Sequence, residues 1–483
     1  MRKVNLQTKP EAQDKLFGLA LFFIFFIVSL PLMVNYCIDG TNLSFYLRVL
    51  KEGGAENLFF LIPSLLVRAG IQGESVYKLF LLLINAATTL IAYVCFRGIF
   101  GDKIVGLVGS MVYTWMPYRL NNLYSRGDLG EALAMTFLPV LLIGWYRLFA
   151  GEETGEEGGK KQWLLLTVGY SLLLQSYLLS FLTAAGFTLL LCLIQWKKTL
   201  KKQTILTLLK TVLGVAVLNA WTAILLLYRI RMSQFPFGTV GNGRIQSRGV
   251  YLSDFIQLFS RNGSVHDVAE EGMQQIQPFG PGFVVTFCCL IYLWLLFVGR
   301  YRNRDEKKTT LKFTAVLTGL GAVCALMSLN SFPWDFLQGR NRLLYGLIVC
   351  LYEPTRLLLL VAVCLTATAC AVVWQIKKWE SRDVSRWFLL AVAVIALMTT
   401  QYLTGDILRT GVPRNLNGTS FGGEVTEAEY QPENLDISPL DYAKYEGSRY
   451  PAPVVFYGAE AVSVAGIGIL AVLTGRKKRV EEV

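Results

Sequence analysis

The chain has 483 residues, of which 53% are hydrophobic and 17% charged, and its mean hydropathy is +0.45. Ordinary soluble domains contain ~25% charged residues. The composition therefore excludes a soluble globular enzyme, a disordered chain and a small secreted module held by disulfides. Because a membrane-spanning helix needs ~20 mostly apolar residues, the chain has room for roughly ten to twelve spans and little else.

The net charge is +12, and the chain holds nine cysteines and a single histidine, His266. In a soluble protein this basic balance would favour nucleic acid. Here the basic residues fall in short loops between apolar runs, as the positive-inside rule predicts, so we expect no nucleic-acid partner. Most cysteines lie inside apolar runs and none forms a CxxC pair, which favours buried hydrophobic residues over a redox framework. One histidine cannot build a multi-histidine zinc site.

The first apolar run begins at Leu16, after a basic start. It is too long for a signal peptide and no small-residue cleavage site follows it, so it predicts a first span. Further apolar runs lie near 75–96, 104–117, 132–149, 204–228, 281–298, 313–329, 355–375, 387–403 and 454–474. The stretch 163–196 is broken by Gln175, Ser176 and Tyr177, which predicts two short spans. About twelve spans place both termini in the cytoplasm of a multi-pass cell-membrane protein.

Lysine marks one face of this predicted bundle. The loops placed inside are short and lysine-rich, whereas the loops placed outside hold mostly arginine. The predicted outer segments are 37–74, 118–130, 229–280, 330–354 and 404–453. Arginine suits bidentate recognition of phosphate or carboxylate, although compositional drift explains the split equally well. Because the non-membrane mass lies in these outer segments, we expect the function on the outer face.

Two apolar segments of the outer loops are too short to span, one from Ala55 and one from Arg342. Runs of ~10–14 residues are typical of interfacial or re-entrant helices. The predicted fold class is therefore an all-α polytopic membrane protein, a single transmembrane domain over 1–483 with interfacial helices in the outer loops.

Asp39 is the first candidate for chemistry. It follows the first span and precedes the stretch 42–52, whose leucines share one face of a helix that can lie on the membrane. Arg48 in that stretch would sit within reach of the interface. A carboxylate beside an apolar surface can act as a general base, because burial and neighbours tune its pKa. A water-exposed loop acid is the alternative.

A second cluster opens the span near 132–149. Asp128 and Glu131 are three residues apart and share a helix face. The simplest account is a capping box, with Asp128 as N-cap and Glu131 at the third position. Arg119 and Arg126 flank the pair, and Tyr124 adds aromatic surface. Carboxylates and arginines at one membrane boundary also suit a hydroxyl-rich or phosphorylated ligand, and aromatic-belt anchoring explains the tyrosine equally well.

A third cluster lies at the start of the span near 355–375. Pro354 suits a first helical turn, which places Arg356 where the helix dipole disfavours a cation. Arg356 therefore needs an anionic partner. Glu353 is the nearest one in the sequence, and a bound phosphate at the helix start is the alternative. Asp335 belongs to the same outer region.

These clusters, in this order, resemble a family: bacterial polytopic membrane proteins related to 6-pyruvoyl-tetrahydropterin synthase, in the GT-C glycosyltransferase superfamily. The matching motifs are YSRGDLGEALA at 124–134, FPWDFLQ at 332–338, YEPTR at 352–356 and EVTEAEYQP at 424–432. The family has an acidic residue in the first outer loop and a second acidic motif between the third and fourth spans. Asp39 and the Asp128/Glu131 pair match those places. The resemblance implies a GT-C-like bundle.

The resemblance also implies an activity for the catalytic candidates. The chain would move a sugar from a polyprenyl-phosphate donor to a hydroxyl on a glycan, lipid or polymer acceptor of the cell envelope, as in polysaccharide assembly. Asp39 would take the acceptor proton, while Glu131 and Asp128 would orient the acceptor or hold a cation. No cofactor is assigned, and a divalent cation at the two carboxylates is left open.

In this scheme Arg356, with Arg119 or Arg126, would hold the lipid phosphate that becomes the leaving group. Two other functions stay open. A transporter or flippase for a lipid-linked glycan predicts charged residues within the spans, for which Lys210 and Arg147 are the few candidates. A non-catalytic partner in envelope glycan assembly would suit the absence of the histidines that family members often carry near the first acidic residue.

Overall fold

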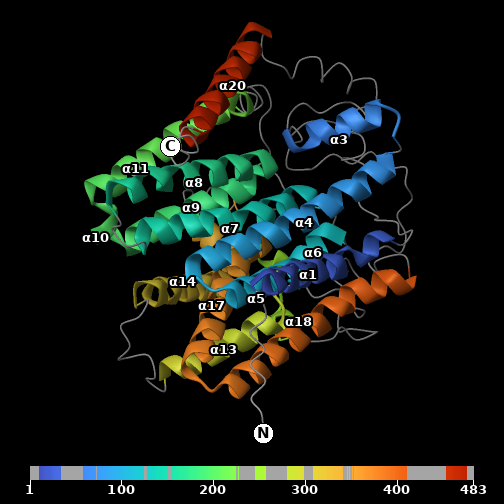
Figure 1. The fold of residues 1–483 in the computed structure, drawn as a ribbon. Coiled ribbons are helices and arrows are strands. Elements are labelled where there is room, and N and C mark those ends of the chain that lie inside the picture. Colours follow the sequence, from blue (N-terminus) through green and yellow to red (C-terminus); the bar gives the residue numbers. More distant parts are fainter. Residues whose placement is uncertain are drawn as a thin grey trace.

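The computed structural model describes residues 10–33, 58–71, 73–124, 128–150, 155–224, 227, 245–256, 280–297, 308–340, 345, 348, 351, 353–410 and 453–475. Those residues form helices joined by short turns, with no strand among them (Figure 1). The one extended pairing in these ranges is an isolated parallel bridge between Val250 and Leu329. The predicted all-α class is confirmed.

Within the described ranges, a helix occupies each of the twelve predicted apolar stretches. These helices are α1 (Pro10–Ser29), α4 (Gly73–Phe100), α5 (Lys103–Thr114), α7 (Leu129–Phe149), α8 (Gly155–Ser176), α9 (Leu178–Ile194), α11 (Lys202–Leu218), α13 (Phe283–Phe297), α14 (Lys308–Ser328), α17 (Leu358–Trp379), α18 (Arg382–Thr410) and α20 (Pro453–Gly475). The shorter elements are η1 (Leu30–Met33), α3 (Leu58–Arg68), α6 (Pro117–Tyr124), α10 (Trp196–Thr199), η2 (Gln246–Arg248), η3 (Leu252–Phe255), α15 (Trp334–Arg340) and η5 (Pro354–Leu357).

Six helical segments in the described part are long and apolar enough to cross a membrane. They are Asp14–Met33, Ser75–Phe100, Leu129–Phe149, Thr309–Ser328, Pro354–Trp379 and Arg382–Gln401. Only 28% of the first and of the last of these is buried inside the protein, so their apolar side chains face outward. Exposed apolar surface on this scale is costly in water and favourable in lipid. The chain is therefore a membrane protein.

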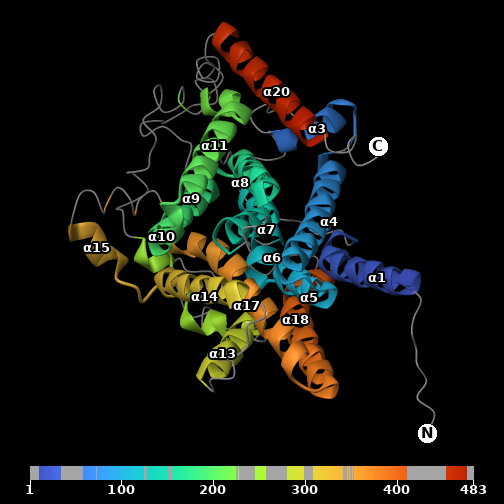
Figure 2. The same cartoon turned by 60° about the vertical axis from the view of Figure 1, so that its left-hand side comes forward.

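Helix α17 lies among the other helices of the bundle (Figure 2), and all its residues from Leu358 to Gln375 are buried. It contacts α4, α5, α7 and α9 from the first half of the chain and α13, α14 and α18 from the second. Gly321 lets α14 approach closely, because a Cβ there would lie 2.9 Å from Leu365 Cδ2. Small residues and cross-helix hydrogen bonds replace the hydrophobic effect between helices in lipid. Thr318 and Thr368 provide such a bond, with 2.8 Å between their hydroxyl oxygens.

The predicted break at Gln175–Tyr177 is confirmed. Helix α8 ends at Ser176, and Tyr177 is extended before α9 begins. The Gln175 amide donates to α11, 3.0 Å from Asn219 Oδ1, and so fixes the end of α8 against that helix. The Tyr170 hydroxyl contacts the Ala184 carbonyl oxygen at 3.3 Å, which shows that α8 and α9 fold back on each other as a hairpin.

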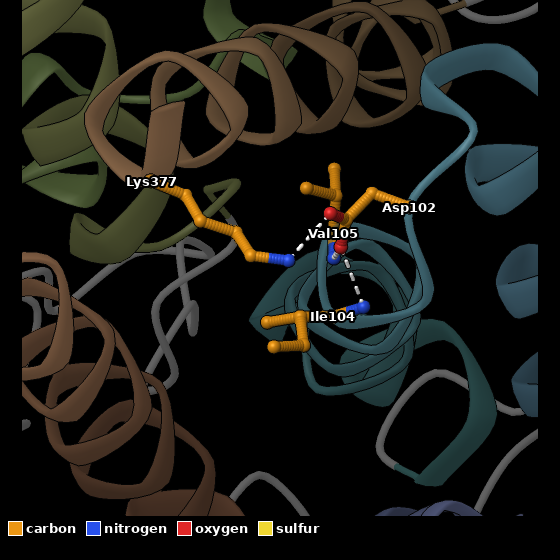
Figure 3. A network of polar contacts seen from close by, with 4 residues as sticks. All are labelled: Asp102, Ile104, Val105 and Lys377. Atoms are coloured by element: carbon orange, nitrogen blue, oxygen red, sulfur yellow. Dashed lines mark hydrogen bonds and ion pairs between the residues drawn. The ribbon is translucent and has the colours of Figure 1, made fainter. Parts of the chain in front are cut away.

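An ion pair ties α17 to the turn between α4 and α5. Asp102 is the N-cap of α5, and its carboxylate accepts the backbone N–H groups of Ile104 at 2.8 Å and Val105 at 3.2 Å. The same carboxylate accepts a hydrogen bond from the Lys377 ammonium of α17 (Figure 3). Partial burial raises the pKa of Asp102, but the Lys377 hydrogen bond and the backbone N–H groups outweigh it and lower the pKa overall. This carboxylate therefore stays ionised at neutral pH.

Candidate functional site where α7, α9 and α17 begin

The start of α7 places a buried carboxylate against α6. Asp128 is the N-cap of α7, and its carboxylate accepts the Glu131 backbone N–H at 3.1 Å, which confirms the predicted cap. Glu131 is 1% exposed and its side chain accepts a hydrogen bond from the Tyr118 hydroxyl of α6. A carboxylate in the first turn of a helix is favoured by the helix dipole. The fold thus holds Glu131 in one orientation inside the protein.

Tyr177 connects the start of α7 to the start of α17. A Cβ on Gly130, the neighbour of Glu131, would lie only 2.9 Å from Tyr177 Cδ2, so the tyrosine ring packs directly on this turn. The guanidinium carbon of Arg356 lies 4.9 Å from the centroid of the same ring, a cation–π contact. Arg356 is only 4% exposed. Tyr177 thus links the turn next to Glu131 with Arg356, while the predicted approach of the Glu131 and Arg356 side chains within one cavity stays a prediction.

The turn that carries Arg356 follows the predicted pattern. Glu353 is extended and occupies the N-cap position of η5 without a side-chain cap bond, and Pro354 occupies the first turn, as expected from its fixed φ. The Arg356 backbone N–H donates to the Glu353 carbonyl oxygen at 3.2 Å. The Glu353 carboxylate accepts a hydrogen bond from the Thr355 hydroxyl at 3.1 Å. These local bonds fix the turn and leave the Arg356 side chain directed at Tyr177.

Arg119 and Tyr124 lie in a second buried network that joins α6 to α4 and α1. Arg119 donates from Nη2 to Asn85 Oδ1 at 2.8 Å and to Thr88 Oγ1 at 3.1 Å, and from Nη1 to the Thr114 carbonyl oxygen at 3.2 Å. The Asn85 amide also donates to the Tyr124 hydroxyl at 2.8 Å. Burial lowers the pKa of Arg119 to about 10, which leaves it charged at neutral pH. Contact of these two side chains with a ligand stays a sequence-based prediction.

Asp335 lies at the edge of the same region. Its carboxylate accepts the Gln246 backbone N–H at 3.2 Å, and its own backbone N–H donates to the Gln246 side chain at 3.4 Å. The bridge between Val250 and Leu329 holds this segment along the end of α14. Element η2, which contains Gln246, also contacts η5, the turn that carries Arg356. Asp335 is therefore connected to that turn indirectly, by way of η2.

Asp39, Arg48 and Arg126 lie outside the described residues, as does the segment 424–432. The predicted approach of Asp39 to Glu131 and Arg356 therefore stays a prediction. Tyr177 is the side chain that sequence reasoning missed, because the tyrosine was read only as part of a helix break. Its position as the last residue of the polar interruption that begins at Gln175, at a predicted outer span end, is the available signal.

The charged residues considered for a transport path lie on the surface. Lys210 of α11 and Arg147 of α7 are both exposed. The neighbours of Lys210 are exposed apolar residues, Leu209, Val212 and Leu213. A transport path would instead need charges that face the bundle interior.

The site combines a buried carboxylate, a buried guanidinium and an aromatic ring. Such a set can hold hydroxyl groups at the carboxylate and a phosphate at the guanidinium. Asp128 and Glu131 are the carboxylates that could hold a divalent cation there. Within the part of the chain that the structure describes, no three His, Cys, Asp or Glu side chains gather as a metal site. No protein-family model and no curated protein matches the chain.

Proposed function

We propose that the chain is a GT-C-type glycosyltransferase of about 12 spans. It moves a sugar from a polyprenyl-phosphate donor to a hydroxyl of a glycan, lipid or polymer acceptor on the outer face of the cell membrane, with both termini cytoplasmic. The observation that carries the proposal is that the Tyr177 ring packs on Gly130, the neighbour of Glu131, and also on the Arg356 guanidinium, where three helices begin. The sequence segments that resemble GT-C motifs, YSRGDLGEALA and YEPTR, include the residues of two of these turns, those before α7 and α17.

Arg356 suits the leaving group of this reaction. As the bond between the sugar and the donor phosphate breaks, its electron pair stays on the phosphate oxygen and negative charge develops there. A buried, orientated guanidinium stabilises such charge more strongly than an exposed one. The ring of Tyr177 packs against the guanidinium, which reduces the reorganisation needed at the moment of reaction.

Glu131 suits the orientation of sugar or acceptor hydroxyls. Tyr118 holds one carboxylate oxygen, and the cap by Asp128 fixes the backbone beneath it. Asp39 is the proposed base: it takes the acceptor hydroxyl proton as the acceptor oxygen forms the new bond to the sugar. Its place in the sequence shortly after the first apolar run supports this role, together with the resemblance of the motif order to that of the GT-C superfamily.

The transporter alternative has less support. Lys210 faces outward, and the central helix α17 is packed on all sides. The scaffold alternative predicts a stable protein without transfer activity. The transporter and the scaffold would both lack sugar-transfer activity, so the rate of sugar transfer distinguishes them from the proposed enzyme.

The test is transfer of a labelled sugar from a polyprenyl-phosphate donor in proteoliposomes. Glu131→Gln keeps the size of the side chain and loses its charge, and Asp39→Asn cannot accept a proton, so each should lower kcat/KM by ~100-fold or more. Arg356→Lys keeps the charge but loses the planar fork, and should mainly weaken donor binding. Asp383→Asn is the matched control, because it removes an exposed carboxylate at the other end of the bundle.

Two outcomes would count against the proposal. Activity of both carboxylate variants within about threefold of wild type would remove Asp39 and Glu131 from the chemistry. A wild-type protein that is folded but inactive with every polyprenyl-phosphate donor would favour the scaffold.

A further inference from the structure

A group of lysines gathers at the corner formed by α10 and the start of α11. Lys197, Lys198, Lys201, Lys202 and Lys210 are all exposed. The sequence from 178 to 218, which covers α9, α10 and α11, contains no aspartate or glutamate. These three helices therefore present a surface of one charge sign.

The fold adds a lysine from a distant part of the chain. The Lys198 ammonium donates to the carbonyl oxygen of Phe149, the last residue of α7. Partial burial lowers the pKa of Lys198, and the charges of Lys201 and of Lys312 on α14 lower it further. The positive charges of Lys201, just before α11, and of Lys312 thus both disfavour the Lys198 ammonium, and an anion at this corner would offset that effect.

The same corner carries apolar residues suited to a membrane interface. Trp196 is 57% exposed, and Leu193 and Leu200 beside it are 70% and 64% exposed. Tryptophan prefers the level of the lipid headgroups, where its ring is partly apolar and partly wet. The mixture of lysine, tryptophan and leucine indicates a lipid surface rather than bulk water.

Lys210 extends this corner toward the bilayer. It lies two turns after Lys202 on the same face of α11, ~12 Å farther along the helix. Its side chain leans toward the helix N-terminus, as side chains do in α-helices, and therefore toward α10. Leu209 and Leu213 around it are exposed and apolar. An ammonium in this setting extends along the helix to reach polar groups at the interface.

We propose that the α10–α11 corner binds the headgroup of an anionic phospholipid. The phosphate lies at Lys197 and Lys202, Lys210 attracts it from farther along α11, Trp196 sits at the headgroup level, and an acyl chain follows the exposed leucines of α11. The proposal is independent of the glycosyltransferase function, because it uses no residue of that site.

The experiment is native mass spectrometry of the delipidated full chain, titrated with phosphatidylglycerol or phosphatidylcholine. Wild type should retain phosphatidylglycerol preferentially. A lysine near an anionic headgroup contributes roughly fivefold in affinity, so Lys202→Gln with Lys210→Gln should lower phosphatidylglycerol binding by ~10-fold or more. The change should leave phosphatidylcholine binding unaltered.

Two further variants make the result specific. Arg382→Gln with Arg386→Gln removes two exposed charges from the start of α18, and should leave phosphatidylglycerol binding at the wild-type level. Lys202→Arg with Lys210→Arg should restore binding if the charge is what matters. If the Arg382→Gln, Arg386→Gln variant lost as much phosphatidylglycerol binding as the lysine variant, the preference would come from overall charge and the site would be wrong. Unchanged phosphatidylglycerol binding in Lys202→Gln with Lys210→Gln would also overturn the site. Matched thermal unfolding of all variants excludes misfolding as the cause.

Discussion

At the scale of single residues, one tyrosine determines how the candidate site is organised. Tyr177 offers its face to the Arg356 guanidinium and its edge to the turn that contains Gly130. Only glycine fits at that turn, because a methyl group would overlap the ring. The distance between α7, which carries Glu131, and η5, which carries Arg356, therefore depends on the absence of a Cβ at Gly130.

Gly130→Ala tests this dependence. The added methyl lies 2.9 Å from Tyr177 Cδ2, so the ring must shift and Arg356 must shift with it. We expect a loss of ~1–3 kcal/mol in stability, as for other overpacked sites, together with a lower kcat/KM for sugar transfer. Thermal unfolding in detergent and the proteoliposome assay measure the two effects.

Gly186→Ala is the matched control, because a Cβ on this α9 glycine meets nothing within 4 Å. Alanine there should be neutral or stabilising by up to ~1 kcal/mol, since it favours the helix. Equal behaviour of the two variants would contradict the packing role of Gly130.

Sequence reasoning at this scale succeeded where the signal is local. The Asp128 cap and the first-turn position of Pro354 follow from neighbours within four residues, and both are confirmed. The roles of Tyr177 and Asn85 depend on residues from other helices. Nothing in the sequence around Asn85 shows that it accepts a hydrogen bond from Arg119 and donates one to Tyr124. Long-range packing decides such partners.

At the scale of elements, Asp102 serves two elements at once. It caps α5 and receives the Lys377 ammonium of α17. Replacement by asparagine keeps a side-chain acceptor for the cap and removes the ion pair, whereas alanine removes both. We expect Asp102→Ala to be less stable than Asp102→Asn by ~0.5–2 kcal/mol, the usual contribution of an N-cap. Thermal unfolding of the two variants gives the difference.

The same residue predicts a pH dependence. The pKa of Asp102 is lower in the folded chain than in the unfolded chain, so its contribution to stability is complete above the ordinary pKa. That contribution is lost as the pH falls below about 4, where the unfolded carboxylate binds a proton first. The wild type should therefore lose more thermal stability than Asp102→Asn between about pH 6 and about pH 3, the range in which carboxylates titrate. Parallel curves for the two proteins would contradict the ion pair.

Helix α20 approaches α11 closely at Gly466. A Cβ on Gly466 would lie 2.7 Å from Val217 Cγ1, whereas a Cβ on Gly468, half a turn later, meets nothing within 4 Å. Gly466→Val should separate the two helices at a cost of ~1–3 kcal/mol. Gly468→Val should change stability by no more than ~0.5 kcal/mol, as at other open positions. A lower unfolding temperature in Gly466→Val alone is the expected result.

At the scale of the whole molecule, the apolar runs and their polar interruptions predict where helices form. They do not predict which helices pack against each other. Each apolar stretch contains a helix, and the long stretch 163–196 divides at the expected residues. The sequence did not indicate that α17 occupies the centre while α1 and α18 lie at the surface. All three are strongly apolar, and in lipid an apolar face is satisfied equally well by lipid or by protein. The choice depends on the fit of side chains between helices.

The predicted topology can be tested with single cysteines. Leu252→Cys lies in the predicted outer segment 229–280, where the leucine is 65% exposed, and Lys197→Cys lies in α10 at the predicted inner face. A membrane-impermeant maleimide should label Leu252→Cys in intact cells and Lys197→Cys only after permeabilisation. The parent chain gives the background from the native cysteines. The opposite labelling pattern would reverse the orientation and move the candidate site to the cytoplasmic side.

The position of α17 also constrains how the chain is assembled during synthesis. Each of its faces is covered, and α18, which follows it in the chain, supplies one of the covering surfaces. Until α18 is made, that side of α17 must be in contact with lipid or with the insertion machinery. The bundle is therefore closed late, by a helix that lies at its periphery, and the lipid that first surrounds α17 must leave as α18 packs. A nascent chain that stops after α17 would contain almost all of the candidate site and yet remain open on one side.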